Sequence, residues 1–500
     1  MPTKKSQRAT TSKKRVRKKA TRAGRSKASA SRTAVKGTKK LLAAAAPKLV
    51  ALAANTALDN LNKIEHIVVL MLENRSFDHM LGYLTLENGR TDVDGLTAGM
   101  ANSLGNQSFP VHQLTKPAFN QGQDPCHSGA CVDEQLSNNN GGFVSNYHNA
   151  HPNDPAVDLA MGYYSGSMLK VYDHLARHFL ICDRWFCPVP GSTWPNRLYA
   201  VAGRAADSRD NRQPPLYNLT SFVRHLDARN VKWRWYAHDI ATLRAVDLQF
   251  RLPLSFVRKN VAYFDQRSTF GGNSFLEDAR AGKLAPVSWI DPNFVDLNFI
   301  GPSGSNDDHP PSDVRDGQEL VLKVYNALIN SPQWPTTLLI VTYDEHGGFF
   351  DHVAPPPAND DSPAFGRYGP RVPTFIVSPW VEAGQVSHTV FDHTSIIKTI
   401  LARFCRQAGG QVPDMGARVN AAEHLGGLLT RQTPRPAPPP AALDHLIAHI
   451  AQFKSAVFTM KMAAQSKDAV AHPRELNELQ QGIQKAKAAL RKRGLPKGQP

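Results

Sequence analysis

Two pairs of oxygen-bearing side chains each follow a short apolar run of the sequence. Asp344 and Glu345 follow the run Leu338–Thr342 with one residue between, and Glu73 and Asn74 follow a similar run. Short continuous runs of Ile, Val and Leu are typical of buried strands. In open α/β sheets the carboxyl ends of the strands form the edge where ligands bind. We expect the four side chains to converge on one divalent cation, since carboxylate and amide oxygens suit Mg²⁺, Ca²⁺ or Mn²⁺.

A pair of hydroxyl groups stands in a third polar segment. Ser192 and Thr193 follow the turn residues Pro190 and Gly191, and the stretch NRLYAVAG after them predicts a helix. A hydroxyl at a helix N-terminus lies beside unpaired N–H groups and a partial positive charge, which favours an anion and helps to stabilise an alkoxide. From these residues alone, an ordinary Ser or Thr N-cap is the alternative.

Alternating strands and helices must hold these side chains in place. Apolar runs of strand length alternate with helical patterns over roughly 370 residues, which predicts a large layered α/β domain. The expected strands are His66–Leu72, Pro286–Pro292, Leu338–Thr342 and Pro373–Pro379, and the expected helix faces are Leu320/Val324/Leu328 and Ile396/Ile397/Ile400/Leu401/Phe404.

The net charge of +17 is concentrated at the N-terminus of the 500-residue chain. Residues 1–40 hold 16 Lys and Arg and no acid, which leaves 43 basic and 42 acidic residues elsewhere. We predict a disordered basic arm and lead-in at 1–62 and a catalytic domain at 63–432. A Pro-rich linker follows at 433–443 and a basic helical tail at 444–500.

The arm has the composition of a polyanion-binding segment. It can attract an anionic membrane surface or nucleic acid through many weak contacts. A solvated tail that only aids solubility is the alternative. No apolar run reaches the roughly 18–20 residues that a membrane span needs, so we expect no transmembrane segment.

The compartment is less clearly marked. The stretch Leu41–Ala54 has the apolar character of a signal-peptide core, but Pro47 and Lys48 interrupt it, so we interpret it as a short lead-in. We expect a cytoplasmic protein, with export as the alternative. The five cysteines include two pairs spaced five apart, Cys126/Cys131 and Cys182/Cys187. Disulfides and reduced thiols are both compatible with this pattern.

Four long motifs resemble those of a known enzyme family. The motifs IVVLMLENRSFDHMLGYL, CDRWFCPVPGSTWPNRLY, TLLIVTYDEHGGFFDHVAPP and FDHTSIIKTILARF are similar to those of the bacterial phosphoesterase family, which includes non-haemolytic phospholipases C and acid phosphatases. The resemblance covers roughly Ile64 to Arg406. It implies a three-layer alkaline-phosphatase-like fold, with a large mostly parallel sheet between helices.

The resemblance also implies roles for the residues in these motifs. Glu73, Asn74, Asp344 and Glu345 correspond to metal ligands for one divalent ion, which can be Mg²⁺, Ca²⁺, Mn²⁺ or Zn²⁺. Thr193 corresponds to the nucleophile. Ser192 stands where the family commonly has Pro, so a second hydroxyl lies next to Thr193 and is the alternative nucleophile. Ser192 and Asn196 are also expected to contact the substrate.

Histidines in motif-like contexts complete the expected site. His127, His309 and His352 are expected to act in catalysis, and either His309 or His352 is expected to protonate the leaving alcohol. His393 is a further candidate, for which a structural role fits equally well.

Three aromatic residues lie near Thr193 in the sequence. Trp185, Trp194 and Tyr199 could enclose a quaternary ammonium group, although core packing is the alternative.

These features predict a phosphoric ester hydrolase. The leading hypothesis is a phospholipase C type enzyme that cuts a phosphatidylcholine-like lipid to diacylglycerol and a phospho-head group, through a phospho-threonine intermediate. The first alternative is an acid phosphatase acting on phosphomonoesters. A sulfatase fits less well, because STWPNR lacks the element that a formylglycine enzyme needs. An alternative of another class is a polyanion-binding protein with an inactive hydrolase body.

Overall fold

The structure of the chain is a computed structural model. It describes residues 57–115, 124–238, 240–251, 260–267, 272–295, 305–407, 410–452 and 478–492. The basic arm and the Leu41–Ala54 stretch lie outside these residues. Within the described part of the chain, no helix is both long and apolar enough to cross a bilayer.

A single eight-stranded sheet forms the centre of the described fold, with the strand order β12-β6-β11-β10-β1-β9-β7-β8. Only β11 runs opposite to the other strands, because its two pairings are antiparallel and the remaining five are parallel. In chain order the strands are β1 (His66–Leu72), β6 (Leu180–Cys182), β7 (Trp233–Ala237), β8 (Val261–Tyr263), β9 (Val287–Asp291), β10 (Thr337–Tyr343), β11 (Thr374–Val377) and β12 (Val386–Ser387).

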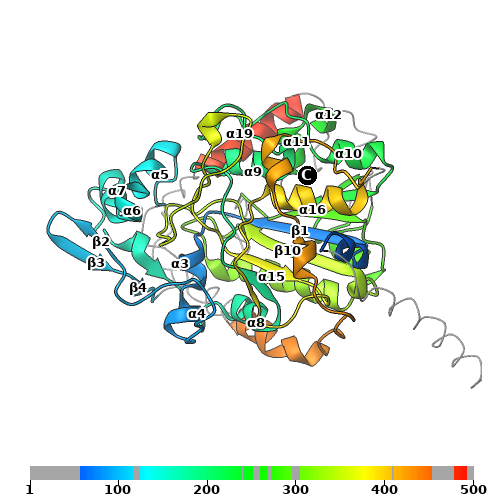
Figure 1. Ribbon diagram of the computed structural model, residues 1–500, viewed down its shortest axis with the longest axis horizontal. Helices are drawn as coiled ribbons and strands as arrows, with labels where there is room; N and C mark the ends of the chain where they lie inside the picture. Colours follow the sequence, from blue (N-terminus) through cyan, green and yellow to red (C-terminus); the bar gives the residue numbers. More distant parts are fainter. Residues whose placement is uncertain are drawn as a thin grey trace, which may run out of the picture. The chain divides into compact units, whose positions relative to one another are not determined.

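Helices cover both faces of this sheet (Figure 1). One face carries α9 (Thr193–Ala202), α10 (Val223–Ala228), α11 (Thr242–Val246) and α16 (Thr394–Phe404), and the other carries α8 (Lys170–His178) and α15 (Val314–Ile329). The central strands are apolar and buried on both sides, as β10 shows with seven buried residues out of seven. A strand between two helical layers requires this composition. The predicted mostly parallel sheet between helices is confirmed.

The apolar patterns located the central elements correctly. All four predicted strands and both predicted helices are present, as β1, β9, β10, β11, α15 and α16. The strands β6, β7, β8 and β12 were not predicted. Three of these four have only two or three residues, too few for a periodic pattern to stand out.

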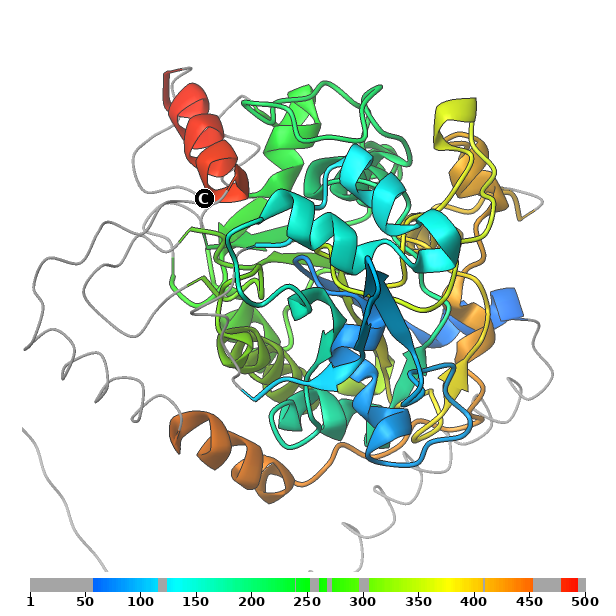
Figure 2. The same cartoon turned by 90° about the vertical axis from the view of Figure 1, so that its left-hand side faces the viewer.

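A smaller group of elements lies beyond the carboxyl ends of the parallel strands. It faces the viewer in Figure 2 and contains the two-stranded sheet of β2 (Ala101–Leu104) and β3 (Gln107–Pro110). The same group contains α3 (Phe77–Leu81), α5 (Gly129–Gln135), α6 (Ser137–Asn140) and α7 (Phe143–Ala150). The loops that enter and leave these elements surround the edge of the sheet where the candidate active site lies.

The described parts of the C-terminal tail are helical. Residues 444–452 form helix, and α19 spans Glu478–Lys492. This agrees with the helical tail that the sequence predicts. The predicted boundaries of the arm, the catalytic domain and the linker stay predictions.

Candidate active site

Two strand ends meet at the centre of the site. In the parallel pairing of β1 with β10, Leu72 is opposite Tyr343, so Glu73 and Asn74 leave the sheet beside Asp344 and Glu345. The Asn74 N–H donates a hydrogen bond to Asp344 Oδ1 at 3.1 Å. The convergence expected from the two strand ends is therefore present in the structure.

Two glycines allow this close approach. Gly347 has a φ of 65°, and a Cβ at this position would lie 2.1 Å from the Asn74 carbonyl oxygen. Gly348 has a φ of 73°, and its Cβ would lie 2.7 Å from the Cys126 carbonyl oxygen. A side chain at either position would be both strained and obstructed. The pair of glycines after the two acids is thus explained by the packing of the site.

The Thr193 hydroxyl points into this group. Thr193 is the first residue of α9, and its Oγ1 donates to Asn74 Oδ1 at 3.2 Å. The next N–H, that of Trp194, donates to Asn211 Oδ1, and Pro195 has no N–H. Among the first three residues of the helix, the Thr193 amide is the one left to face an anion.

Two imidazole rings lie on the other side of the Asn74 side chain. The Nε2 atoms of His127 and His309 are 3.4 and 3.1 Å from Asn74 Nδ2. Each ring donates its Nδ1 proton to a backbone carbonyl, of Pro125 and Pro310 respectively, so Nε2 faces the site. Burial lowers the pKa of His309. Its ring is therefore neutral at neutral pH when the site holds no anion.

Arg197 connects the acidic side chains of the two strand ends. Its guanidinium lies 2.7 Å from Glu73 Oε1 and 3.0 Å from Asp344 Oδ2, and all three side chains are buried. Arg197 stands one helical turn after Thr193, so the nucleophile candidate and this guanidinium come from the same face of α9. The helix thus places a hydroxyl and a cation together at the strand ends.

Negative charge at this edge exceeds the positive charge that faces it. Burial raises the pKa of Glu73 well above its usual range and that of Asp344 to about 7, although Arg197 opposes both changes. Burial also raises the pKa of the adjacent Asp307.

The pKa of Glu345 changes in the opposite direction. Burial opposes ionisation of Glu345 too, but the charges of His127 and His346 outweigh this effect and lower the pKa of Glu345. Several buried carboxyl groups thus share one guanidinium.

This surplus charge fits a divalent cation. Beyond the Arg197 ion pair, neither carboxylate oxygen of Glu73 has a hydrogen-bond partner within the described residues, and Glu345 Oε1 and Asp307 Oδ2 have none either. Buried oxygens without donors are costly unless a cation or water satisfies them. The residues of the predicted ligand set therefore suit the metal ion that the family resemblance implies.

A second group with converging ligand atoms borders the first. Oxygen and nitrogen atoms of Asp124, His127 and His309 lie within 4.8 Å of one another. The His127 Nε2 atom is also 3.9 Å from Glu345 Oε1. The two groups with converging ligand atoms therefore share His127 as a neighbour.

His352, the third histidine expected in catalysis, pairs with two carboxylates. Its Nδ1 is 2.6 Å from Asp78 Oδ2 and its Nε2 is 3.2 Å from Asp94 Oδ1. Arg371 bonds to Asp78 at 2.9 Å and to Asp351 at 2.8 Å, so cations already balance this cluster. Burial by itself lowers the pKa of His352, but the charge and hydrogen bond of Asp78 outweigh it and raise that pKa to about 9. The contacts of His352 are those of an ion-pair network.

His393 supports the site from behind. Its Nδ1 accepts a hydrogen bond from the Trp185 indole at 3.1 Å, so its Nε2 carries the proton and donates to the Asp344 carbonyl at 2.7 Å. Burial lowers the pKa of this ring to about 3. A neutral ring in this position holds the backbone of Asp344, which is a positioning role.

The side chains of Ser192 and Asn196 form hydrogen bonds with backbone groups around the N-terminus of α9. Ser192 is the N-cap residue of α9, and its Oγ donates to the His127 carbonyl at 3.4 Å rather than capping the helix. Asn196 accepts from the Val189 N–H and donates to the carbonyls of Gly191 and Ser192. The Asn196 amide therefore fixes the turn that presents Thr193.

The three aromatic side chains near Thr193 are packed in the interior. Trp185, Trp194 and Tyr199 are each at most 1% exposed. The Tyr199 ring already carries the Arg418 guanidinium at 4.8 Å, and its hydroxyl donates to Asp360. Core packing, the alternative weighed for these rings, accounts for Trp185 and Tyr199.

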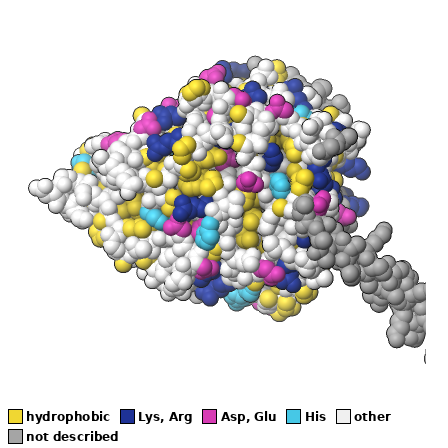
Figure 3. Space-filling model, viewed as in Figure 1, with side chains coloured by type: hydrophobic (Ala, Val, Ile, Leu, Met, Phe, Trp, Pro, Cys, Tyr) yellow, Lys and Arg dark blue, Asp and Glu magenta, His cyan; other side chains and the backbone are white. Residues whose placement is uncertain are grey.

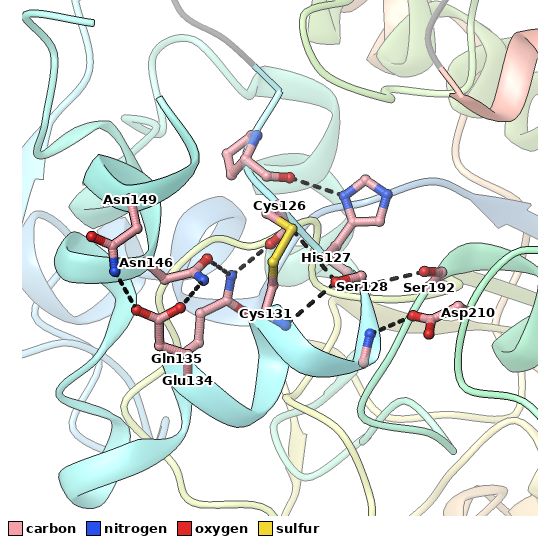
Figure 4. Close-up of a disulfide and its surroundings, with 12 residues drawn as sticks. Cys126, His127, Ser128, Cys131, Glu134, Gln135, Asn146, Asn149, Ser192 and Asp210 are labelled. Carbon is pink, nitrogen blue, oxygen red and sulfur yellow. Dashed lines mark hydrogen bonds between the residues drawn. A yellow bond between two sulfur atoms is a disulfide. The ribbon is translucent and has the colours of Figure 1, made fainter. Parts of the chain in front are cut away.

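A disulfide fixes the segment that carries His127 (Figure 4). Cys126 and Cys131 are bonded, whereas Cys182 and Cys187 are free and buried. Gln135 donates to the Cys126 carbonyl at 2.6 Å and accepts from His346 Nε2 at 2.8 Å. The loop of His127 is thus tied both to α5 and to the segment after β10.

Several residues of the site were not singled out from the sequence. Arg197 and His346 lie inside recognised motifs, in STWPNR and DEHGG, and Asp124 lies three residues before His127, which was singled out. The spacing of Thr193 and Arg197 by four residues was an available signal, because it places both on one helix face. Asp307 lies two residues before His309, so it too stood beside a histidine that was singled out.

Taken together, the fold and the site define an α/β protein with a buried hydroxyl group beside an acidic centre at the carboxyl ends of its strands. Residues 64–405 match the Phosphoesterase family. The chain is 33% identical over 376 residues to non-specific phospholipase C1 of Arabidopsis thaliana, which covers 68% of this chain and 67% of that protein. It is 32% identical over 413 residues to phospholipase C B of Mycobacterium tuberculosis. This match covers 72% of this chain and 76% of that protein.

A solved structure of an alkaline phosphatase superfamily protein from Vibrio parahaemolyticus shows a weaker likeness. It has a TM-score of 0.31 and 11% identity, and covers 51% of this chain and 64% of that one. A likeness of this size carries no conclusion about activity. The sequence matches do support a conclusion about activity. The chain belongs to the phosphoesterase family and is a phosphoric ester hydrolase.

Proposed function

We propose that this enzyme is a phospholipase C type phosphodiesterase that uses Thr193 as its nucleophile. The observation that carries the proposal is the position of the Thr193 hydroxyl, which contacts Asn74 between the acidic strand ends and two histidines. The relatives named as phospholipases C support a lipid diester as the substrate class. The products would be diacylglycerol and a phospho-head group.

The site residues suggest a division of labour. Glu73, Asn74, Asp344 and Glu345 would hold one divalent cation, and Asp124 with the two histidines is the neighbouring group that could share it. When bound, such a cation lowers the pKa of a nearby hydroxyl and offsets phosphate charge. The Thr193 amide and the Nε2 atoms of His127 and His309 would orient the phosphate oxygens.

Thr193 and His309 would carry the two chemical steps. The Thr193 hydroxyl loses its proton to solvent and its oxygen attacks phosphorus, the bond to the leaving alcohol breaks, and a phospho-threonine forms. His309 gives its Nε2 proton to the departing oxygen. A water molecule then attacks phosphorus and gives a proton to the same nitrogen. The bond between phosphorus and the Thr193 oxygen breaks, the phospho-head group leaves, and the Thr193 oxygen regains a proton from solvent. The bound phosphate anion would raise the pKa of His309 and so supply the protonated ring.

An acid phosphatase is the second candidate. The lowered pKa of His309 is consistent with it, because this ring becomes the protonated general acid only at a more acidic pH than an exposed histidine. A polyanion-binding protein with an inactive body is disfavoured, because the hydroxyl and all four predicted ligands are present and adjacent.

We also propose that the protein is exported from the cytoplasm. The Cys126–Cys131 disulfide supports the export alternative, because disulfides persist in oxidising compartments.

The deciding experiment compares a chromogenic phosphocholine diester with a chromogenic phosphate monoester, each with and without chelator. We expect faster turnover of the diester and loss of both activities on chelation, with recovery when divalent metal is added back. Preference for the monoester would favour the phosphatase. Activity that is unaffected by prolonged chelation would contradict the role given to the four ligands.

A further inference from the structure

Two helices of the chain carry the same short pattern of histidines. The stretch Asp173–His178 reads DHLARH and the stretch Asp444–His449 reads DHLIAH. The first lies in α8 and the second in the helical residues 444–452. In a helix, residues four apart share a face. Each helix therefore presents a pair of imidazole rings on one face.

The fold brings these two helices together. The His174 ring centroid lies 4.3 Å from that of His178 and 6.3 Å from that of His445. Leu443, Leu446 and Ile450 are buried, so the C-terminal helix is docked through its apolar face. Figure 1 shows this segment next to α8, and Figure 3 shows histidine and basic side chains together along the same edge of the molecule.

A pocket lies where the rings meet. Its volume is about 490 Å³, and His174, His178 and His445 line it together with the carboxylates Asp173 and Glu87. Lys170 and Arg177 also line it, but Arg177 pairs with Asp173 at 2.7 Å. The pocket is therefore polar and close to neutral, and three imidazole rings and two carboxylates line it. None of these residues belongs to the candidate active site.

The ring spacing suits a transition metal. With zinc–nitrogen bonds of about 2.0–2.1 Å in a tetrahedral site, two ligating imidazoles have centroids about 5 Å apart. The two distances in the structure lie on either side of this value. In the present rotamers the nitrogen atoms do not yet converge. The exposed His178 and His445 rings would turn to reach the ion, which exposed side chains do rapidly.

His174 is already oriented as a metal ligand would be. Its Nε2 lies 3.4 Å from the Tyr325 hydroxyl, which leaves Nδ1 for a metal ion. Such an outer hydrogen bond fixes the ring and is the usual companion of a ligating histidine.

We propose that His174, His178 and His445 bind one zinc-class transition metal ion, with Asp173, Glu87 or water completing its coordination. The ion would cross-link the C-terminal helix to α8, away from the chemistry. Neutral imidazole ligands and a small number of carboxylates favour Zn²⁺ over the hard cations expected at the active site. The site would thus secure the C-terminal segment on the catalytic body.

The test uses the full-length protein and the double variant His178→Ala/His445→Ala. Both side chains are exposed, so the fold should tolerate their loss. After chelation and dialysis, each protein is titrated with Zn²⁺ and its bound metal is measured. We expect the wild type to hold one zinc equivalent more than the double variant, because the active site is the same in both. The matched control is His388→Ala, which removes a histidine that is 61% exposed at another place.

Limited proteolysis adds a readout that is independent of activity. Zn²⁺ should slow the release of the C-terminal segment from the wild type and from His388→Ala, but not from the double variant. Equal zinc content in the wild type and the double variant would overturn the proposal, as would a loss of zinc in His388→Ala of the same size. Inorganic phosphate bound at this pocket in place of zinc would also contradict it.

Discussion

The Thr193 hydroxyl donates its hydrogen bond to the side-chain carbonyl of Asn74, at 3.2 Å. Both side chains are fully buried, and they come from α9 and from the loop after β1. The contact joins the proposed nucleophile to a proposed metal ligand. It also shows that Thr193 is not a surface residue, so its substitution must be chosen with packing in mind.

The variant Thr193→Val tests the nucleophile, because it replaces the hydroxyl with a methyl group of similar size. We expect turnover of a chromogenic diester to fall by about 10³-fold or more. The unpaired Asn74 oxygen should cost about 1–3 kcal/mol of stability, measured by urea denaturation. Thr193→Ser, which keeps a hydroxyl, should retain activity, and Ser192→Ala should have a mild effect. The opposite result for Thr193 and Ser192 would move the nucleophile by one residue.

The variants Glu73→Gln and Asp344→Asn test the ligand set. Each should lose bound metal and activity, measured by elemental analysis and by turnover. In the metal-free protein, each should raise the melting temperature, because one buried carboxylate is removed from a group that shares a single guanidinium. Added metal should then stabilise the wild type more than the variants. Full metal occupancy in both variants would be incompatible with the assignment.

The variant Arg197→Met tests the buried ion pairs. It leaves Glu73 and Asp344 without their cation, so we expect the metal-free protein to lose about 3–5 kcal/mol of unfolding free energy. Lys323→Met, which breaks the exposed pair with Glu319, should cost less than about 1 kcal/mol. Similar losses in the two variants would mean that Arg197 contributes no more than a surface charge.

The pKa of His352 predicts a pH dependence of stability. It is raised from 6.5 to about 9 by Asp78. The protonated ring therefore stabilises the folded state fully below pH 6.5, and this contribution of up to about 3 kcal/mol is lost as the pH rises to 9. Urea denaturation should show this decline in the wild type, and His352→Gln should flatten it. An unchanged slope in that variant would assign the decline to other groups.

Deleting residues 1–56 tests the basic arm and leaves α2 (Ala57–Asn60) in place. Turnover of a soluble diester should not change, because the described site is complete without the arm. Binding to anionic vesicles or nucleic acid should weaken, and binding by the intact chain should fall as salt rises. Equal binding by both proteins at low salt would leave the arm as a solvated tail.

The central strands were predictable because burial on both faces requires continuous apolar runs. β1 was predicted with its observed bounds, and β10 was predicted to within one residue at each end. The strands at the sides of the sheet were not predicted. β6 and β12 contain three and two residues, and their pairing partners hold them in place rather than a pattern of their own.

The sequence by itself determined which strand ends carry the acids and that Thr193 begins a helix, because apolar periodicity and local motifs fix these features. Only the tertiary structure decided which groups meet. In the fold, His127 and His309 lie beside Asn74. His352 pairs with Asp78 instead. Arg197 lies between Glu73 and Asp344 and pairs with both. The physical reason is that these contacts join loops far apart in the chain, and a loop's path depends on packing against the whole fold.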